Sequence, residues 1–533
     1  MTKPVEDHTP LPSSTVTTTN LVEGHAPLVM EHKSGRQFQW YNVGMVLLIS
    51  FGSFTFGYPG SIIATTLAQP TFNTYFKLGE RANANTLIGL CNSLFQTGGV
   101  IGALTVSTVA DRWGRKWCIA VKCFIGLVAG SCLPASQNIE MFIAFRFFAG
   151  WAAWSLLAII PVWISEISPP NIRGLLVDIH VVAIGIGYLM AALVGYGFYW
   201  LPHENNWSWR GPLLFAIPWP AILLSCLFWM PESPRWLMRQ GRFEEAEVLL
   251  QKLHLPDEAR IESLEIRQSI ELERRLATSW LSMFTKKSYR KRTMLAVLVT
   301  IACQNAGALV VYNYGPIIYA SLGFSQNKVF LYQVGFTITS VGTLSGSLFI
   351  IDRVPRPKMM VAGLVCCSTC LVIIAGLVGK FASAEALKQP NAPALKTAIA
   401  FIYLLSGCFE FFLESTQFTY LSEIFPSQIR TKGVSIGVAT VAAINIMWLQ
   451  VAPHAFKSIG WRFYICFFVP ALCFAALIWF FVPDTHRIPL EEVAKLFGDY
   501  DELAAADRDV VLAVGNNEEQ VGKVETHHAE RGV

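Results

Sequence analysis

The sequence predicts an all-α membrane protein with twelve transmembrane helices in two six-helix, pseudo-symmetric bundles. Apolar stretches of about 20 residues recur along the chain, and each is long enough to cross about 30 Å of hydrocarbon as a helix. Hydrophobic residues make up 53% of the 533 residues and charged residues only 15%, which is little charge for a soluble protein. A third observation is an internal repeat of charged motifs between the apolar stretches.

The internal repeat pairs each motif in the first half with a copy in the second. SEISPPNIRG at 165–174 returns as SEIFPSQIRTKG at 422–433. Upstream of these lie DRWGRK at 111–116 and the looser DRVPRPK at 352–358. Two halves that carry the same charged motifs between apolar spans indicate an internally repeated membrane protein.

The apolar spans divide the chain into five segments. We expect a disordered cytosolic tail over 1–39, which is polar and has neither an apolar core nor a secretory pattern. We then expect a six-helix bundle over 40–230, a cytosolic helical linker over 231–292, a second six-helix bundle over 293–483 and a cytosolic tail over 484–533. The twelve spans are predicted near 42–64, 87–109, 117–136, 141–164, 175–199, 211–230, 293–317, 329–351, 359–379, 397–421, 433–455 and 462–482.

Basic residues gather in the loops that follow the even-numbered spans, for example Arg112, Arg115, Arg353 and Arg356. This asymmetry predicts that those loops and both termini are cytosolic. We therefore expect a multi-pass protein in contact with the lipid bilayer, in the plasma membrane. The net charge of +4 gives no sign of a nucleic-acid partner. Asn206 opens a glycosylation sequon in an outer loop close to the membrane.

The twelve cysteines lie almost wholly within apolar spans, which is typical of small hydrophobic side chains rather than of disulfides or a zinc site. The chain shows no activated nucleophile, metal-ligand set or phosphate-binding loop. We therefore expect no enzymatic activity, no cofactor and no metal.

Several motifs occur together in the chain: DRWGRK, Arg146 with Gly150 in the fourth span, SEISPPNIRG, PESPRWL at 231–237 and PDTHRIPLEEV at 483–493. With them the chain resembles the sugar porter family of the major facilitator superfamily, and fungal hexose transporters among its members, over roughly residues 40–497. The resemblance implies the major facilitator fold, in which two bundles rock about a central binding site that is exposed to each side in turn.

Opposite charges gather at the predicted cytosolic ends of spans in both halves. Because the acids recur at matched offsets, we interpret the set as gating charges that pair when that face is shut and separate when it opens. The alternative is a positive-inside anchor with incidental acids. The predicted gating charges are Asp111, Arg115, Arg146, Glu166, Arg173, Asp352, Arg356, Glu423 and Arg430.

The resemblance places the substrate site mainly on the seventh, eighth, tenth and eleventh spans. Several polar residues of the family are apolar here, at Val181, Cys303 and Leu309, and the family tryptophan of the tenth span is Phe418. A sugar site needs several donors and acceptors. The predicted substrate-binding residues are Gln304, Asn305, Asn313, Tyr314, Ser340, Glu414, Phe418 and Asn445, and Gln417 could compensate for lost positions.

Glu410 and Glu414 lie one turn apart in the tenth span, with Glu414 about 13 Å above the cytosolic motif at 1.5 Å per residue. Carboxyl groups near the middle of a bilayer are costly and usually functional. The pair is a candidate proton site or a partner for a polar group of the substrate; the alternative is a permanently protonated pair bonded to a neighbouring helix. Proton-coupled relatives carry an aspartate after Gly-Tyr in the first span, where this chain has Pro59, and this loss favours uncoupled diffusion.

These observations favour a permease that moves a small-molecule substrate, a hexose or a related sugar or polyol, with protons as a second partner if transport is coupled. Two other functions stay open. One is an exporter of a less polar metabolite, suggested by Val181, Leu309 and Phe418. The other is a non-transporting nutrient sensor that signals through its tails.

Overall fold

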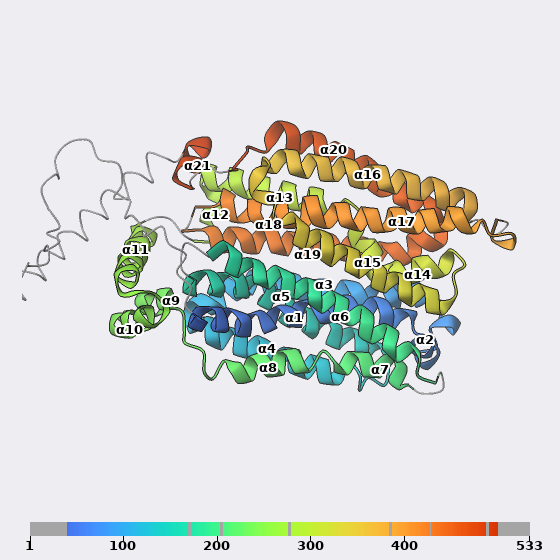
Figure 1. Ribbon diagram of the computed structural model, residues 1–533, viewed down its shortest axis with the longest axis horizontal. Helices are drawn as coiled ribbons and strands as arrows, with labels where there is room; N and C mark the ends of the chain where they lie inside the picture. Colours follow the sequence, from blue (N-terminus) through green and yellow to red (C-terminus); the bar gives the residue numbers. More distant parts are fainter. Residues whose placement is uncertain are drawn as a thin grey trace, which may run out of the picture. The chain divides into compact units, whose positions relative to one another are not determined.

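The computed structural model describes residues 40–168, 173–202, 206–275, 279–382, 386–426, 428–486 and 490–498. All regular secondary structure in these ranges is helical. Each of the twelve predicted spans corresponds to one helix or to consecutive helical segments, so the all-α fold is confirmed (Figure 1).

The first six spans form one bundle. Within it α3 packs against α5, α1 against α6 and α5, and α4 against α5 and α8. The spans are α1 (Trp40–Ala68), α3 (Ala84–Trp113), α4 (Arg115–Cys132), α5 (Ile139–Ile167), α6 (Arg173–Tyr199) and the consecutive pair α7 (Trp207–Leu214) and α8 (Pro218–Cys226). The short helices α2 (Pro70–Tyr75) and η1 (Leu78–Glu80) connect α1 to α3.

The last six spans form a second bundle, in which α16 packs against α20 and α17 and α13 packs against α19. The seventh span is α13 (Lys287–Gln304) with α14 (Ala308–Ser321), and it begins within the stretch predicted as linker. The tenth is α17 (Ala392–Cys408), which continues through the π-helical η5 (Phe409–Glu414) into α18 (Ser415–Ile424). The others are α15 (Gln326–Ser347), α16 (Arg356–Phe381), α19 (Arg430–Ser458) and α20 (Ile465–Phe481), which follows η6 (Gly460–Tyr464).

Within the described ranges, nine helical segments are long and apolar enough to cross a membrane. The three other predicted spans differ for reasons visible in their sequences. Helix α4 carries Arg115, Lys116 and Lys122 within 18 residues. The sixth span is interrupted by a turn before Pro218, and α15 is rich in threonine, serine and glutamine.

Five shorter helices adjoin one end of the bundles. They are α9 (Pro234–Arg239), α10 (Phe243–Leu253), α11 (Pro256–Arg275), α12 (Ser282–Thr285) and α21 (Leu490–Phe497). The Asn42 amide of α1 donates to the Leu253 carbonyl (2.6 Å), and the Arg292 guanidinium of α13 lies 4.5 Å from the centre of the Phe497 ring. We call this the motif end, because the doubled charged motifs lie here, and the opposite end of the spans the far end.

Small residues let α3 and α5 approach closely. A Cβ atom on Gly98 would collide with the Phe147 carbonyl, and one on Gly150 with the Phe95 carbonyl. Close backbone approach at small residues is a common way for membrane helices to pack.

The two halves contact each other along α3 with α19 and α6 with α15. The Ser93 hydroxyl donates to Gln450 Oε1 (2.8 Å), Thr86 bonds His454 (3.1 Å) and the Tyr196 hydroxyl donates to Asn327 Oδ1 (2.9 Å). The Gln326 amide also donates to the Ala68 carbonyl (2.6 Å). These four hydrogen bonds join the two halves toward the far end, so the far end is closed in this conformation.

Candidate functional site

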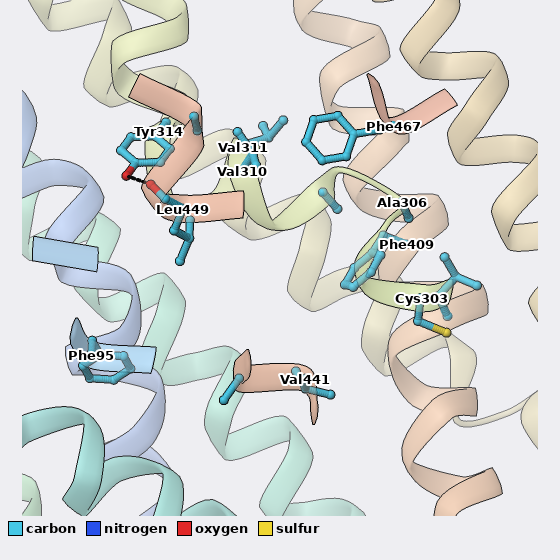
Figure 2. Close-up of a cluster of buried hydrophobic side chains, with 14 of the residues drawn as sticks. Phe95, Cys303, Ala306, Val310, Val311, Tyr314, Phe409, Val441, Leu449 and Phe467 are labelled. Carbon is cyan, nitrogen blue, oxygen red and sulfur yellow. Dashed lines mark hydrogen bonds between the residues drawn. The ribbon is translucent and has the colours of Figure 1, made fainter. Parts of the chain in front are cut away.

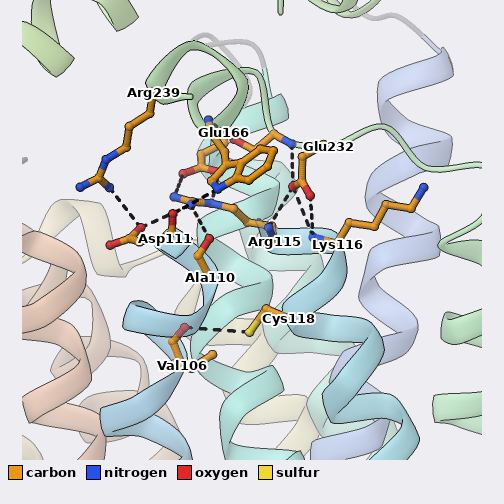
Figure 3. A network of polar contacts seen from close by, with 11 residues as sticks. Val106, Ala110, Asp111, Arg115, Lys116, Cys118, Glu166, Glu232 and Arg239 are labelled. Atoms are coloured by element: carbon orange, nitrogen blue, oxygen red, sulfur yellow. Dashed lines mark hydrogen bonds and ion pairs between the residues drawn. The ribbon is translucent and has the colours of Figure 1, made fainter. Parts of the chain in front are cut away.

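A buried ion pair joins α4 to α5 at the motif end of the first half (Figure 3). Arg115 Nε donates to Glu166 Oε2 (2.9 Å) and Arg115 Nη2 to Glu166 Oε1 (2.7 Å), and both side chains are less than one-tenth exposed. Arg115 Nη1 donates to the Ala110 carbonyl (3.1 Å) and lies 3.4 Å from Asp111 Oδ1. This two-pronged geometry is the strong form of an arginine–carboxylate contact.

The second half repeats the pair. Arg356 Nε donates to Glu423 Oε2 (3.2 Å) and Arg356 Nη2 to Glu423 Oε1 (2.7 Å). Arg356 Nη1 donates to the Ile351 carbonyl, five residues earlier, as Arg115 donates to Ala110. Thr485 adds a hydroxyl bond to Glu423 Oε2 (2.6 Å). The doubled motifs therefore build the same local structure twice.

Each arginine also begins a helix whose first amides are capped by a distant acid. Glu232 Oε1 accepts from the Arg115 backbone N–H (2.9 Å), and Asp484 Oδ1 accepts from that of Arg356 (3.2 Å). Acids are favourable at helix N-termini. Burial raises the pKa of Glu232, and the backbone N–H groups and Arg115 offset this only in part.

Sequence reasoning did not assign a role to either capping acid. A signal was present: Pro231-Glu232-Ser233 and Pro483-Asp484-Thr485 are a third repeated motif of proline, acid and hydroxyl residue, one at the end of each half.

The geometry differs from the predicted gate in one respect. Arg115 and Glu166 belong to the same half, and so do Arg356 and Glu423. Relative movement of the halves therefore does not by itself separate either pair. Their direct effect is to fix α4 to α5 and α16 to α18. Asp111 additionally holds α9, because Arg239 pairs with its carboxylate (3.3 Å) and Trp236 Nε1 donates to its carbonyl (3.2 Å).

Arg146, another predicted gating charge, lies away from these pairs. Arg146 lies about 30 Å along α5 from Glu166 at 1.5 Å per residue. It is buried, donates to the carbonyls of Cys91 (2.9 Å) and Pro59 (2.8 Å), and so connects α5 to α3 and α1. Arg430 Nε donates to the Phe425 carbonyl (3.4 Å). The side chains of Arg173 and Asp352 lie outside what the structure describes.

A polar network occupies the interior of the second half. The Tyr312 hydroxyl donates to Glu410, the Ser406 hydroxyl lies 3.5 Å from that of Tyr312, and Ser340 bonds Ser406 (2.5 Å). One turn along, the Gln417 amide donates to Glu414, and Gln304 Nε2 donates to Gln417 Oε1 (3.3 Å). The network brings together Gln304, Ser340 and Glu414, which were predicted from separate spans.

The acidic pair of this network lies on the π-helical η5 and has uncharged partners. Tyr312 bonds Glu410, and Gln417 bonds Glu414; in the described part of the chain no basic side chain bonds either carboxyl group. From the first half, the Tyr188 ring of α6 approaches Tyr312 with a centroid distance of 6.0 Å. The pair therefore lies close to the contact between the two halves.

The remaining predicted substrate residues lie in different surroundings. The Tyr314 hydroxyl donates to the Leu449 carbonyl (2.7 Å; Figure 2). Asn305 and Asn313 donate within their own helical turns, to the carbonyls of Ile301 (2.7 Å) and Leu309 (3.1 Å). Asn445 is buried, and its Oδ1 atom has no partner among the described residues. Phe418 is half-buried against the apolar core.

The predicted glycosylation sequon lies at the far end, where Asn206 is exposed and precedes α7. Its third residue, Ser208, is buried and bonds Thr71.

The family model described as sugar (and other) transporter matches residues 45–497. The chain belongs to this family. It is therefore a multi-pass membrane transporter and not an enzyme, as the sequence predicted.

Curated relatives in this transporter family match along most of their length. The MFS-type transporter criB of Aspergillus cristatus is 29% identical, over 86% of this chain and 95% of that protein. The low-affinity glucose transporter HXT1 of Saccharomyces cerevisiae is 27% identical, over 85% of this chain and 81% of that protein. The quinate permease of Emericella nidulans is 27% identical, over 90% of this chain and 93% of that protein.

Among solved structures, the xylose transporter XylE from E. coli in a partially occluded inward open conformation superposes with a TM-score of 0.71. It is 22% identical, and the match covers 84% of this chain and 99% of that chain. This similarity confirms the major facilitator fold.

Proposed function

We propose that this transporter carries a hexose or a related sugar or polyol across the plasma membrane by alternating access, with both termini in the cytosol. The observation that supports it most is the interior network of Gln304, Gln417, Tyr312 and Ser340. These uncharged side chains offer both donors and acceptors near the contact between halves, which is what neutral hydroxyl groups require. Relatives that include a glucose transporter support the same substrate class.

Alternating access has its own support in the contacts between halves. The far end is joined by hydrogen bonds between α3 and α19 and between α6 and α15. Each half is internally fixed by its arginine–glutamate pair. Two stiff bodies that can exchange contacts at one end for contacts at the other suit a rocking movement in the lipid bilayer.

We further propose that Glu410 and Glu414 bind a proton. Glu410 is buried and Glu414 is partly buried. Two carboxylates one turn apart in such a position, bonded only by neutral groups, repel each other if both are ionised. A proton held by the pair removes that repulsion and would couple substrate transport to proton movement. In this proposal the pair takes the role of the first-span aspartate of proton-coupled relatives, where this chain has Pro59. The same carboxyl groups disfavour an anionic substrate at this position. Neither the family nor its relatives favour an exporter of a less polar metabolite or a non-transporting sensor.

Uptake of radiolabelled sugars tests the proposed function. The chain is expressed in cells that lack their own hexose transporters, and uptake of D-glucose, D-xylose and sugar alcohols is measured. We expect saturable uptake of at least one of them, reduced by Gln304→Leu and unchanged by Gln389→Ala, whose side chain is exposed outside the spans. Absence of uptake for the whole panel, with the protein present in the membrane, would refute the proposal.

A further inference from the structure

A stripe of two amides on α3 faces the region where the two halves meet. One face of α3 bonds α19 through Thr86 and Ser93, and another packs its Gly98 against α5. At 100° per residue, Asn92 and Gln96 lie one turn apart between these two faces. By the same count Gln96 lies about 20° from Gly89, which adjoins Gln450 of α19, and Asn92 about 20° from Gly99, which adjoins Trp154 of α5. The two amides therefore lie at the border between the α19 and α5 contacts.

Both amides are buried and leave hydrogen-bonding groups without protein partners. Asn92 is 1% exposed and Gln96 6%. Gln96 Oε1 has no partner within the described ranges. Asn92 adjoins the Tyr314 hydroxyl of the second half, whose proton goes to the Leu449 carbonyl. An amide side chain has two donor and two acceptor positions, so most of the hydrogen-bonding positions of Asn92 and Gln96 have no protein partner.

Trp154 of α5 adds an aromatic ring and another donor beside the amides. Its indole packs on Gly99 of α3, since a Cβ atom on Gly99 would come within 2.5 Å of Trp154 Cδ1. Gly99 is nearly one helical turn from Gln96. Trp154 is 4% exposed, and its Nε1 has no partner among described residues. Phe56 packs edge-on against the ring at 5.1 Å between centroids.

We propose that Asn92, Gln96 and Trp154 form a subsite of the first half that binds the hydroxyl groups of a sugar or polyol. Buried polar groups are almost always paired, and an unpaired one costs free energy, so three neighbouring groups with spare capacity indicate a polar ligand. Sugar hydroxyls both donate and accept, and the apolar face of a sugar packs on an aromatic ring. The subsite also supplies polar contacts in a chain where Val181 and Leu309 are apolar. The inference rests on the proposed function and names the protein groups of the first half that serve it.

Transport kinetics of single variants test the subsite. Gln96→Leu and Asn92→Leu should each raise the KM for a transported hexose about tenfold, because a sugar hydroxyl loses its partner in a dry site. Trp154→Phe, which keeps the ring and removes the N–H group, should raise it less. The melting temperature of the substrate-free Gln96→Leu and Trp154→Phe proteins should not fall, since no protein hydrogen bond to Gln96 Oε1 or Trp154 Nε1 is broken and an unpaired buried polar group is removed. Asn73→Leu is the matched control: its amide donates to the Leu67 carbonyl at the far end (3.1 Å), and its KM should not change.

Monodeoxy hexoses sharpen this test. If Gln96 binds one hydroxyl group, Gln96→Leu should weaken binding of every analogue except the one that lacks that hydroxyl. An unchanged KM for all analogues in all three variants would overturn the subsite.

Thiol labelling separates the subsite from the proposed function. The introduced thiols of Asn92→Cys and Gln96→Cys should react with a small water-soluble methanethiosulfonate reagent in membranes, read by mass spectrometry of the labelled peptide. Reaction at both positions supports a subsite on a water-accessible path even if none of the assayed sugars is carried. No reaction at either position overturns the subsite, whereas failure of the unaltered chain to carry any sugar counts against the proposed function.

Discussion

Arg115 and Glu166 form a buried, two-pronged ion pair between α4 and α5, and Arg356 and Glu423 repeat it between α16 and α18. Each pair stays within its own half. The duplicated motifs therefore act first as internal braces of each half. Contacts that must change during transport are found elsewhere, between α3 and α19 and between α6 and α15.

Removing one member of a brace should destabilise the protein strongly. Glu166→Gln leaves the Arg115 guanidinium buried without its anionic partner, and we expect a loss of about 3 kcal/mol in unfolding free energy. The double variant Arg115→Met with Glu166→Leu should lose less than the sum of the two single changes. Unfolding of the purified protein measures both. The exposed pair Arg81 and Glu140 supplies the control, since Glu140→Gln should cost under about 1 kcal/mol; equal losses at both sites would contradict the brace.

Cross-linking the halves at the far end should stop transport. Ser93→Cys with Gln450→Cys places thiols on α3 and α19, where the Ser93 hydroxyl reaches the end of the long Gln450 side chain (2.8 Å), and a short bis-methanethiosulfonate cross-linker between them would hold the far end shut. Transport should return on reduction. The control is Thr71→Cys with Ser208→Cys, which joins two residues of the same half and should leave transport intact. Full activity with the first cross-link complete would show that the far end does not open.

Neutralising the acidic pair should remove pH dependence. If Glu410 and Glu414 hold the coupled proton, Glu414→Gln leaves a side chain of the same size beside Gln417, but this side chain cannot exchange a proton. Sugar-driven alkalinisation of the medium should disappear in this variant, while exchange of labelled for unlabelled sugar continues. If the variant still takes up as many protons per sugar as the wild type, the pair does not hold the coupled proton. Gln428→Glu, at the motif end, is the control for a change of acidic residues elsewhere in the chain.

The capping acid Glu232 should show a pH-dependent contribution to stability. Burial raises its pKa in the folded protein above that of the unfolded chain. The folded state therefore binds this proton more tightly, and the stabilisation is complete below the unfolded pKa and is lost as pH rises through the raised folded pKa. The stability advantage of the wild type over Glu232→Gln should shrink as pH rises from about 4 through the raised pKa. Denaturant unfolding across this range measures it, and an advantage that grows with pH would mean that the N–H bonds to Arg115 and Lys116 outweigh burial.

Much of the fold could be predicted from the sequence, because span length and the positions of repeated charges are local properties. The repeat also predicted Arg115 with Glu166 and Arg356 with Glu423 as important groups. It could not show which partner each charge would choose, since that depends on helix packing. The prediction that these ion pairs separate when the cytosolic face opens rested only on the position of the charges at the ends of the spans.

The predicted substrate residues come together only in part. Gln304, Ser340 and Glu414, chosen because they match or replace family positions on separate spans, lie in one hydrogen-bond network, and their role in binding stays a prediction. Glu232 and Asp484 were missed because their partners are backbone N–H groups more than one hundred residues away. Asn92, Gln96 and Trp154 give no pattern in the sequence; only the structure shows that they are buried with polar atoms that lack a partner among the described residues.

The π-helical turn at Phe409–Glu414 has a consequence for the whole tenth span. A wider turn of this kind accommodates an inserted residue, and everything after it is rotated relative to α17. Deleting one residue here would turn Gln417 away from Gln304 and, on the same rigid α18, Glu423 away from Arg356. One irregular turn thus sets the rotation of α18 about its axis, and with it the directions of both Gln417 in the interior network and Glu423 in the ion pair with Arg356.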